Sequence, residues 1–299
     1  MNIHDRILCY GEILWDVLPD KKMPGGAPMN VALHLNNLGL DVGFVSRIGQ
    51  DTLGEELKEY LASIGFYNYI LQSDPDHPTS IAKVDMSDPD DPQYQFPDCA
   101  WDYLDLDSDL KKMLGESQII VHGSLAARNK KSFDTLKNIL EAGDHFKVFD
   151  INLRSPNYSK PVIEELLGKA NLVKMNESEL NVLSRWFFSE SNEETLLRKI
   201  SDRFNCQIIT VTKGAGGASL LYEEDYYWHP GFKTHVKDTI GAGDAFLAGM
   251  LYGLLTEKVP SELLSFSCAM GAYVVTKTGA NPRYDMDRVY KIMESTHKP

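Results

Sequence analysis

A short glycine-rich stretch late in the chain carries the residue types from which an anion site can be built. Gly241, Ala242 and Gly243 come directly before Asp244, and an apolar run with helical spacing begins at Phe246. A glycine-rich turn that opens a helix leaves backbone N–H groups without partners, and the helix dipole places partial positive charge behind them. Such a helix start binds anions, phosphate above all. We therefore expect the amides of residues 241–243 to form an anion hole.

Asp244 is an unusual neighbour for a bound phosphate, because its own charge repels the ligand. An acid in this place makes sense when it faces a hydroxyl that must lose a proton, so we expect Asp244 to serve as a general base. The alternative that the stretch leaves open is a tight turn whose Asp only favours the helix start. The rest of the chain has to decide between the two.

The bulk properties exclude several classes of protein. With 299 residues the chain can form one α/β domain, or one domain with a small appendage. A net charge of −13 repels nucleic acid and anionic membranes, so neither is expected as a partner. The four cysteines are scattered without ligand spacing and are expected to be free thiols in a reducing compartment. Without a signal-peptide pattern or a membrane-spanning apolar run, a cytoplasmic location is expected.

Short apolar runs alternate with longer amphipathic segments along most of the chain, which predicts strands followed by helices. Strands are expected over residues 6–11, 14–18, 42–48, 119–121, 147–151, 172–175 and 208–211. Helices are expected over residues 29–38, 52–64, 130–142, 161–169, 177–183, 193–204, 260–277 and 285–295, and two or three antiparallel strands over 218–222, 226–229 and 233–236. This alternation predicts a mostly parallel sheet covered by helices on both faces, a three-layer α/β/α domain. Ligands on such folds bind at the carboxyl ends of the strands.

Residues 73–97 depart from this rhythm. Two short alternating runs flank a loop rich in Asp and Pro, which favours a hairpin-like insertion. Together with the strand near Trp15 it can form a small β lid from about residues 13–25 and 73–97, standing off a single domain of residues 1–299. The acidic loop holds Asp85, Asp88, Asp90 and Asp91 and is interpreted as a solvated turn in preference to a cation site.

Two motifs near opposite ends of the chain resemble the signatures of the ribokinase-like (PfkB) carbohydrate kinases. They are Gly-Gly-Ala-Pro-Met-Asn at residues 25–30 and Asp-Thr-Ile-Gly-Ala-Gly-Asp at residues 238–244. The resemblance covers essentially the whole chain, and residues 11–19, 123–128 and 150–154 are most similar to those of bacterial fructokinases. It implies a three-layer fold with a small β lid and transfer of the γ-phosphoryl group of ATP to a sugar hydroxyl. ATP and Mg²⁺ are the implied cofactors, with a monovalent cation such as K⁺ in some family members.

The resemblance also implies roles for individual residues of the sugar site. Asp244 would accept the hydroxyl proton while the amides of residues 241–243 hold the developing charge. Asp16 and Asn30 would hold sugar hydroxyls, and a carboxylate suits a vicinal diol because it can accept two hydrogen bonds. The remaining sugar-site candidates are Gly25 and Gly26, where the backbone approaches the ring, Arg154, which steers phosphate or substrate, and Phe96 and Trp101, which either cover the sugar or pack in the core.

For the nucleotide, the resemblance implies contacts from Lys174, Asn176, Thr212, Lys213, Gly214 and Gly217. Glu179 and Asn176 match a family motif of the Mg²⁺ and phosphate environment, but residues 176–179 also form a capping box that needs no ligand. Asp238 and the Ile240 carbonyl, with backbone near Lys277 and Gly279, would hold the monovalent cation.

Alternatives remain open at this point. The chain has no Gly-x-x-x-x-Gly-Lys-Ser/Thr motif and no complete dinucleotide fingerprint, which disfavours a P-loop enzyme and an NAD-dependent oxidoreductase. A catalytically silent sugar or nucleotide sensor on the same scaffold is a second alternative. Residues 73–97 contain one Lys among many acids, so we expect a neutral sugar. Fructose comes first, with ribose, 2-keto-3-deoxygluconate and a nucleoside open. A homodimer through the exposed lid strands is expected.

Overall fold

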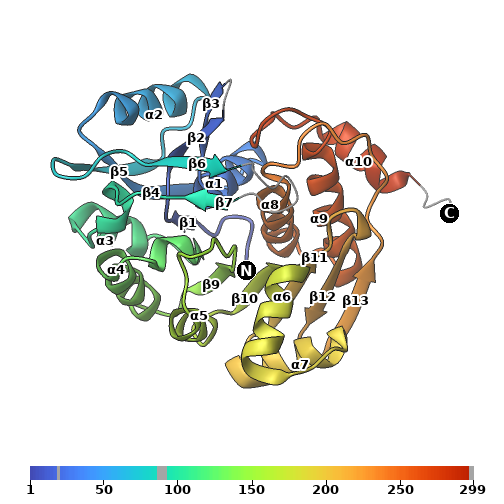
Figure 1. The fold of residues 1–299 in the computed structure, drawn as a ribbon. Helices are drawn as coiled ribbons and strands as arrows, with labels where there is room; N and C mark the ends of the chain where they lie inside the picture. The colour runs from blue at the N-terminus through green and yellow to red at the C-terminus, as the bar shows by residue number, and fades with distance from the viewer. Residues whose placement is uncertain (19–20, 86–92, 296–299) are drawn as a thin grey trace.

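A nine-stranded sheet forms the centre of the computed structural model, which describes residues 1–18, 21–85 and 93–295 (Figure 1). The strand order is β13-β12-β11-β10-β9-β8-β1-β4-β5. The sheet is parallel from β11 to β5, and β12 and β13 add two antiparallel strands at one edge. The strands are β1 (Ile7–Tyr10), β4 (Val42–Gly49), β5 (Tyr69–Asp74), β8 (Ile119–Gly123), β9 (Phe146–Asp150), β10 (Leu172–Asn176), β11 (Ile208–Thr212), β12 (Ala218–Tyr222) and β13 (Asp225–His229).

Helices cover both faces of this sheet and bury a separate apolar core on each. One core joins the sheet to α3 (Ser108–Gly115), α4 (Lys130–Glu141), α5 (Lys160–Leu167), α6 (Glu177–Leu183) and α7 (Glu193–Phe204). The other joins it to α1 (Ala27–Asn37), α2 (Thr52–Ser63), α8 (Ala242–Leu255) and α9 (Pro260–Val274). Helix α10 (Met286–Glu294) packs outside α9. The two faces arise because successive side chains of a strand point to opposite sides, so each buried strand feeds both cores.

A second, four-stranded sheet stands above the carboxyl ends of the central strands (Figure 1). Its order is β3-β2-β6-β7, from β2 (Leu14–Leu18), β3 (Lys21–Gly25), β6 (Ile81–Asp85) and β7 (Gln93–Gln95). The central pair, β2 and β6, is parallel and places Trp15 beside Ile81. We call this sheet the lid. It brings residues from two separate parts of the chain over the same end of the main sheet.

The fold class expected from the sequence is confirmed, because most predicted strands and helices occur within a few residues of their expected ends. Local signals explain several of those ends. Asp51 accepts a hydrogen bond from the Gly54 amide and opens α2, and Asn192 does the same for the Thr195 amide in α7. All four cysteines are buried free thiols. In the part of the chain described by the structure, no helix is long and apolar enough to cross a membrane.

Some predicted elements were wrong or missing. Residues 233–236 do not form a third antiparallel strand, because the chain that follows turns to α9, where the amides of Lys237 and Asp238 donate to the Val275 carbonyl. Residues 73 and 74 belong to the main sheet and not to the lid, since they end β5, an edge strand too polar to show a buried-strand pattern. Asp88, Asp90 and Asp91 of the acidic loop lie outside the described residues.

Candidate active site

The turn that opens α8 has the geometry expected of an anion site. Gly241 is the N-cap residue and adopts a left-handed conformation with φ +78°. A Cβ at this position would lie 2.5 Å from the Ala280 carbonyl oxygen, so a glycine is required for two reasons. The Ala242 amide makes a long contact of 3.3 Å to the Thr239 carbonyl. The amide of Gly243, in the first turn of α8, has no acceptor within its own helix.

Asp244 and Asn30, which the two motifs place 214 residues apart, are in direct contact. The Asn30 Nδ2 amide donates to Asp244 Oδ2 at 2.8 Å. Asn30 lies one turn into α1 and is 5% exposed. The other polar atom of the Asn30 side chain, Oδ1, accepts a hydrogen bond from Asn281 Nδ2 at 2.6 Å. The first turns of α1 and α8 therefore meet at this carboxylate.

Burial raises the pKa of Asp244 from 3.8 to about 6. Within this net shift, Lys174, the Asn30 hydrogen bond and Arg154 act to lower the pKa, and the negative charge of Asp150 acts to raise it. A carboxylate that titrates near 6 is ionised at neutral pH and is still basic enough to accept a proton. Asp244 thus has the protonation behaviour that a general base needs.

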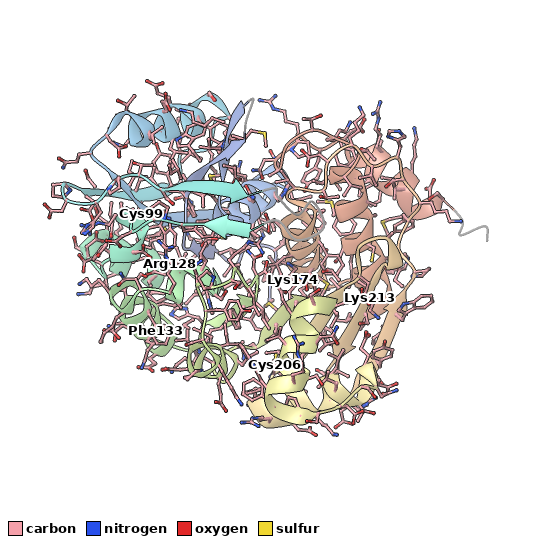
Figure 2. All side chains as sticks on the ribbon, in the orientation of Figure 1. Cys99, Arg128, Phe133, Lys174, Cys206 and Lys213 are labelled. Atoms are coloured by element: carbon pink, nitrogen blue, oxygen red, sulfur yellow. The ribbon has the colours of Figure 1, made fainter. Side chains whose placement is uncertain are left out.

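Lys174, which Figure 2 labels near the middle of the molecule, lies beside the anion turn. The side chain is 7% exposed, and its Nζ contacts both carboxylate oxygens of Asp150, at 2.9 and 3.0 Å. A Cβ on Gly243 would come within 3.1 Å of the same Nζ. Strands β9 and β10 end side by side and supply Asp150 and Lys174, so the positive charge stands directly next to the turn.

The predicted sugar residues gather around the start of α1. Gly25 ends β3, and a Cβ there would lie 2.3 Å from Asp16 Oδ2 on the neighbouring strand β2. The missing side chain therefore makes room for the Asp16 carboxylate. Gly26 caps α1 directly afterwards. Burial raises the pKa of Asp16 from 3.8 to about 6, with Arg154 acting against the shift and Asp244 adding to it.

Glu12 is a buried acid at this site that the sequence analysis did not single out. It is 2% exposed; its Oε1 accepts from the Ala27 amide at 3.3 Å, and Oε2 has no partner among the described residues. Burial raises the pKa of Glu12 to about 7, and Arg154 lowers it. The charge of Arg154 thus lowers the pKa of three carboxyl groups, those of Glu12, Asp16 and Asp244.

Two of the residues predicted to hold metal ions also bind backbone amides. Glu179 accepts from the Asn176 amide at 2.8 Å and from the Leu153 amide at 2.9 Å, so it completes the capping box that the sequence left as an alternative. Asp238 accepts from the amides of Ile240 and Gly279, both at 3.0 Å. No group of three or more His, Cys, Asp or Glu side chains in the described ranges can hold a metal ion.

The carboxylates of Glu179 and Asp238 each accept two backbone amides, and because a carboxylate offers about four lone-pair positions, both can still take a cation. The Ile240 carbonyl and the backbone near Gly279 would add oxygen ligands of the kind that K⁺ takes. Mg²⁺ in phosphoryl transfer is usually held by one or two carboxylates together with substrate phosphates and water. Glu179, Asp238 and Ile240 therefore remain predicted ligands.

The predicted nucleotide turn lies at the end of β11. Gly214 begins a one-turn 3₁₀ helix, and Gly217 follows it and leads into β12. Thr212 Oγ1 contacts the Met175 carbonyl at 3.4 Å on the neighbouring strand. Lys213 forms an ion pair with Glu193 at 2.7 Å, so its charge is already partnered. The turn is therefore near β10 and Lys174, while the Lys213 side chain is directed to α7.

Trp101, for which the sequence left sugar contact and core packing open, packs in the core. It has no exposed surface, belongs to the core beneath α3–α7, and its ring packs 4.3 Å from the Arg128 guanidinium. Phe96 is half-buried at the base of the lid, where it lines a cavity of about 480 Å³ with Arg128, Asn157 and Tyr158. Arg128 donates to the carbonyls of Phe96 and Pro97 and to Asp102, beside Cys99 (Figure 2). These contacts hold the segment that follows β7 against Arg128.

Three residues of the site were missed. Glu12 follows a buried strand directly, and a charged residue in that place is a usable sequence signal. Asp150 ends another strand and was noted only as part of a motif. Asn281 lies in a loop between two helices and carries no local signal, because its partner, Asn30, is 251 residues away.

With this geometry established, comparison with known proteins gives a consistent result. Residues 5–285 match the family model described as pfkB family carbohydrate kinase. A probable fructokinase of Arabidopsis thaliana is 29% identical over 97% of this chain and 93% of its own length. The Escherichia coli fructokinase is 27% identical over 92% of this chain and 94% of its own.

Solved structures agree. A Vibrio cholerae fructokinase double mutant, described as bound to fructose, ADP and potassium ion, superposes with a TM-score of 0.83 at 25% identity, covering 98% of this chain and 99% of that one. An uncharacterized sugar kinase from Pyrococcus horikoshii in complex with ATP gives 0.81 at 27% identity, covering 96% and 99%.

Proposed function

Because the chain belongs to the pfkB family of carbohydrate kinases, we propose that it transfers the γ-phosphoryl group of ATP to a hydroxyl of a neutral sugar, with fructose as the first candidate. Family membership makes the chain a sugar kinase, a phosphotransferase with an alcohol acceptor. The choice of sugar and the residue roles are the proposal.

One observation supports these roles more than any other, the 2.8 Å hydrogen bond between Asn30 and Asp244. It joins the two motifs at a single carboxylate that stands at the opening of a helix. A hydroxyl held by Asn30 is therefore within reach of Asp244, and the amides at residues 241–243 come directly before Asp244 at the start of the same helix. Acceptor, base and anion site are thus brought together by two helix starts.

In the proposed reaction, the sugar hydroxyl gives its proton to Asp244 as its oxygen attacks the γ-phosphorus. The new bond joins sugar oxygen to phosphorus, and the bond between phosphorus and the β,γ-bridging oxygen breaks, so ADP leaves with that electron pair. Phosphoryl transfer asks a protein mainly for alignment and charge stabilisation. The amide of Gly243 and the ammonium group of Lys174 would supply the positive charge, since a Cβ on Gly243 would come within 3.1 Å of the Lys174 Nζ.

The charges around Arg154 support a neutral sugar. The charge of Arg154 acts on the carboxyl groups of Glu12, Asp16 and Asp244, and burial raises the pKa of each. Three carboxyl groups and one guanidinium leave the predicted sugar site with an excess of negative charge. A phosphate or carboxylate on the sugar would add to the repulsion, whereas the hydroxyls of fructose can donate to the carboxylates. The fructose described in the V. cholerae relative favours the same choice.

We further propose that the lid and the main body act as one domain and that the lid closes over the sugar. Asp16 and Gly25 sit on lid strands, so sugar binding and lid position are coupled through these two residues. Closure would exclude water, which otherwise competes with the sugar for the phosphoryl group. The lid edges, β3 and β7, leave backbone groups available for a second subunit. A homodimer is expected by light scattering.

The test is a coupled assay of ADP release with fructose, ribose, 2-keto-3-deoxygluconate and a nucleoside. We expect strong stimulation by fructose, and Asp244→Asn in the same preparation separates this activity from a contaminating kinase. Stimulation by another sugar alone would replace fructose as the substrate. Binding of sugar and ATP detected by thermal shift, without ADP release from any acceptor, would support a silent sensor instead.

A further inference from the structure

The loop between α9 and α10 reaches into the site through one side chain. Asn281 Nδ2 donates to Asn30 Oδ1 at 2.6 Å, and Asn30 Nδ2 donates to Asp244 Oδ2 at 2.8 Å. The two bonds form a chain that starts in the loop and ends on the carboxylate. The same loop is fixed from the other side, where the Gly279 amide donates to Asp238 at 3.0 Å.

Chemistry alone fixes the direction of both hydrogen bonds. An ionised carboxylate only accepts, so Asn30 must present its NH₂ group to Asp244. Asn30 Oδ1 then faces away from the carboxylate and needs a donor, and Asn281 supplies it. Without that donor, the Asn30 amide can rotate by 180° and bring its oxygen against Asp244, which would repel the ionised form.

The other end of the Asn281 amide shows which of its groups matters. Asn281 Oδ1 is buried and has no partner among the described residues. A buried acceptor without a partner costs free energy. The side chain therefore gains nothing at its oxygen, and its NH₂ group, bonded to Asn30, is the part that the site uses.

We propose that Asn281 is a positioning residue, which locks the amide of Asn30 so that it donates to Asp244 and keeps the catalytic carboxylate ionised. The inference rests on the proposed function of Asp244 as the base. Asn281 itself touches Asn30 and not the carboxylate, so it acts only through Asn30.

Other groups also influence Asp244 and must be held constant in the test. These are the titratable and charged groups that interact electrostatically with the Asp244 carboxylate, and they lie on several surrounding segments. They are Glu12, Asp16, Asp150, Arg154, Lys174 and Tyr284. A charged replacement at position 281 would act on Asp244 directly through space. Neutral variants avoid this, so Asn281→Leu removes the donor, Asn281→Gln retains one, and Thr278→Ala on the same loop is an exposed control.

The first measurement is independent of activity. Asp is labelled with ¹³C at the carboxyl carbon, the Asp244 signal is identified by its loss in Asp244→Asn, and its pKa is followed by NMR. We expect Asn281→Leu to raise the pKa of Asp244, Asn281→Gln to return it towards the wild-type value, and Thr278→Ala to leave it unchanged. In an Asn30→Ala background, Asn281→Leu should have no further effect. An unchanged pKa in Asn281→Leu, or an equal rise in the Asn30→Ala background, would overturn the proposal.

The second measurement is turnover against pH with fructose and ATP. Asn281→Leu should lose on the order of tenfold near pH 6 and progressively less towards pH 8, because a carboxylate with a raised pKa is ionised again at higher pH. A pH-independent loss would indicate a merely structural role and would reject the positioning role. If the wild-type protein phosphorylates no sugar, the proposed function fails while the NMR titration still decides the role of Asn281.

Discussion

Lys174 Nζ stands 3.1 Å from the point where a Cβ on Gly243 would be, and both oxygens of Asp150 hold it there. Asp150 and Lys174 are both buried, so the ammonium group cannot easily swing away. The absence of a side chain at Gly243 is therefore matched to a fixed positive charge. A phosphate approaching the helix start would meet the backbone amide and the ammonium group together.

Gly243→Ala is expected to lower turnover by about 10²-fold, because the new methyl group displaces Lys174 or blocks the approach of phosphate. The KM for ATP should rise, and stability should fall by about 1–3 kcal/mol through overpacking. Gly115→Ala is the matched control, since a Cβ there meets nothing within 4 Å. Steady-state kinetics with unchanged kcat and KM in Gly243→Ala would contradict the assignment of the anion site.

Asp244→Ala is expected to lose about 10²–10⁴-fold in turnover, the usual contribution of a general base. The protein should remain folded, because the mutation removes a charge whose burial is unfavourable. Glu262→Ala provides the control, as Glu262 is an exposed acid in the first turn of the adjacent helix α9. Coupled kinetics and a thermal melt on both variants check this. A near-wild-type rate in Asp244→Ala would remove the base assignment.

The rate should depend on pH through Asp244. Its pKa is raised to about 6, and only the ionised form can accept a proton. Plotted against pH, kcat/KM should thus be level above pH 7 and fall about tenfold for each pH unit below 6. Measuring kcat/KM from pH 5 to pH 9 tests for this fall on the acidic side. Residual activity of Asp244→Asn should lack it, and a flat wild-type profile down to pH 5 would speak against the assignment.

Glu12 should make stability depend on pH in the opposite sense from a salt-bridged acid. Burial raises its pKa from 4.5 to about 7, so the folded state binds the proton more tightly than the unfolded state. Its stabilising contribution is complete below pH 4.5 and is lost as the pH rises through 7. Relative to wild type, Glu12→Gln should gain roughly 2–3 kcal/mol in free energy of unfolding between pH 5 and pH 8.

Urea unfolding at both pH values measures the Glu12 effect. The pH dependence is the informative quantity, since the new amide at position 12 changes stability by an amount that is the same at every pH. Glu262→Gln, an exposed acid, should show no such change. Equal differences between Glu12→Gln and wild type at pH 5 and pH 8 would show that the raised pKa is wrong.

The sequence was sufficient for the layers of the fold and for the two motifs that meet where α8 begins. Strand and helix periods depend on local order, so the alternation predicted a parallel sheet, and the glycine turn before Asp244 predicted an open helix start. Asn30 was found only because its motif resembles that of a known family. Nothing in its own neighbourhood indicates a contact with Asp244.

Other features of the site depend on burial and are seen only in the packed structure. Glu12 and Asp16 have the same residue types as many surface acids, and the raised pKa of each follows from its burial. Trp101 had equal claims to the sugar and to the core until its complete burial decided for the core. Glu179 matched a metal motif and a capping box with the same spacing. Its hydrogen bonds confirm the capping box, and a role at a metal ion stays a prediction.

The order in which the site is completed along the chain has a consequence for protein synthesis. Gly241, Asp244 and Asn281 all lie near the C-terminal end, whereas Asp16 and Asn30 are made early. A ribosome-bound chain that has formed the lid and most of the sheet still lacks both the proton acceptor and the loop that orients its neighbour. On the proposed chemistry, the half-made protein can hold a sugar but cannot consume ATP.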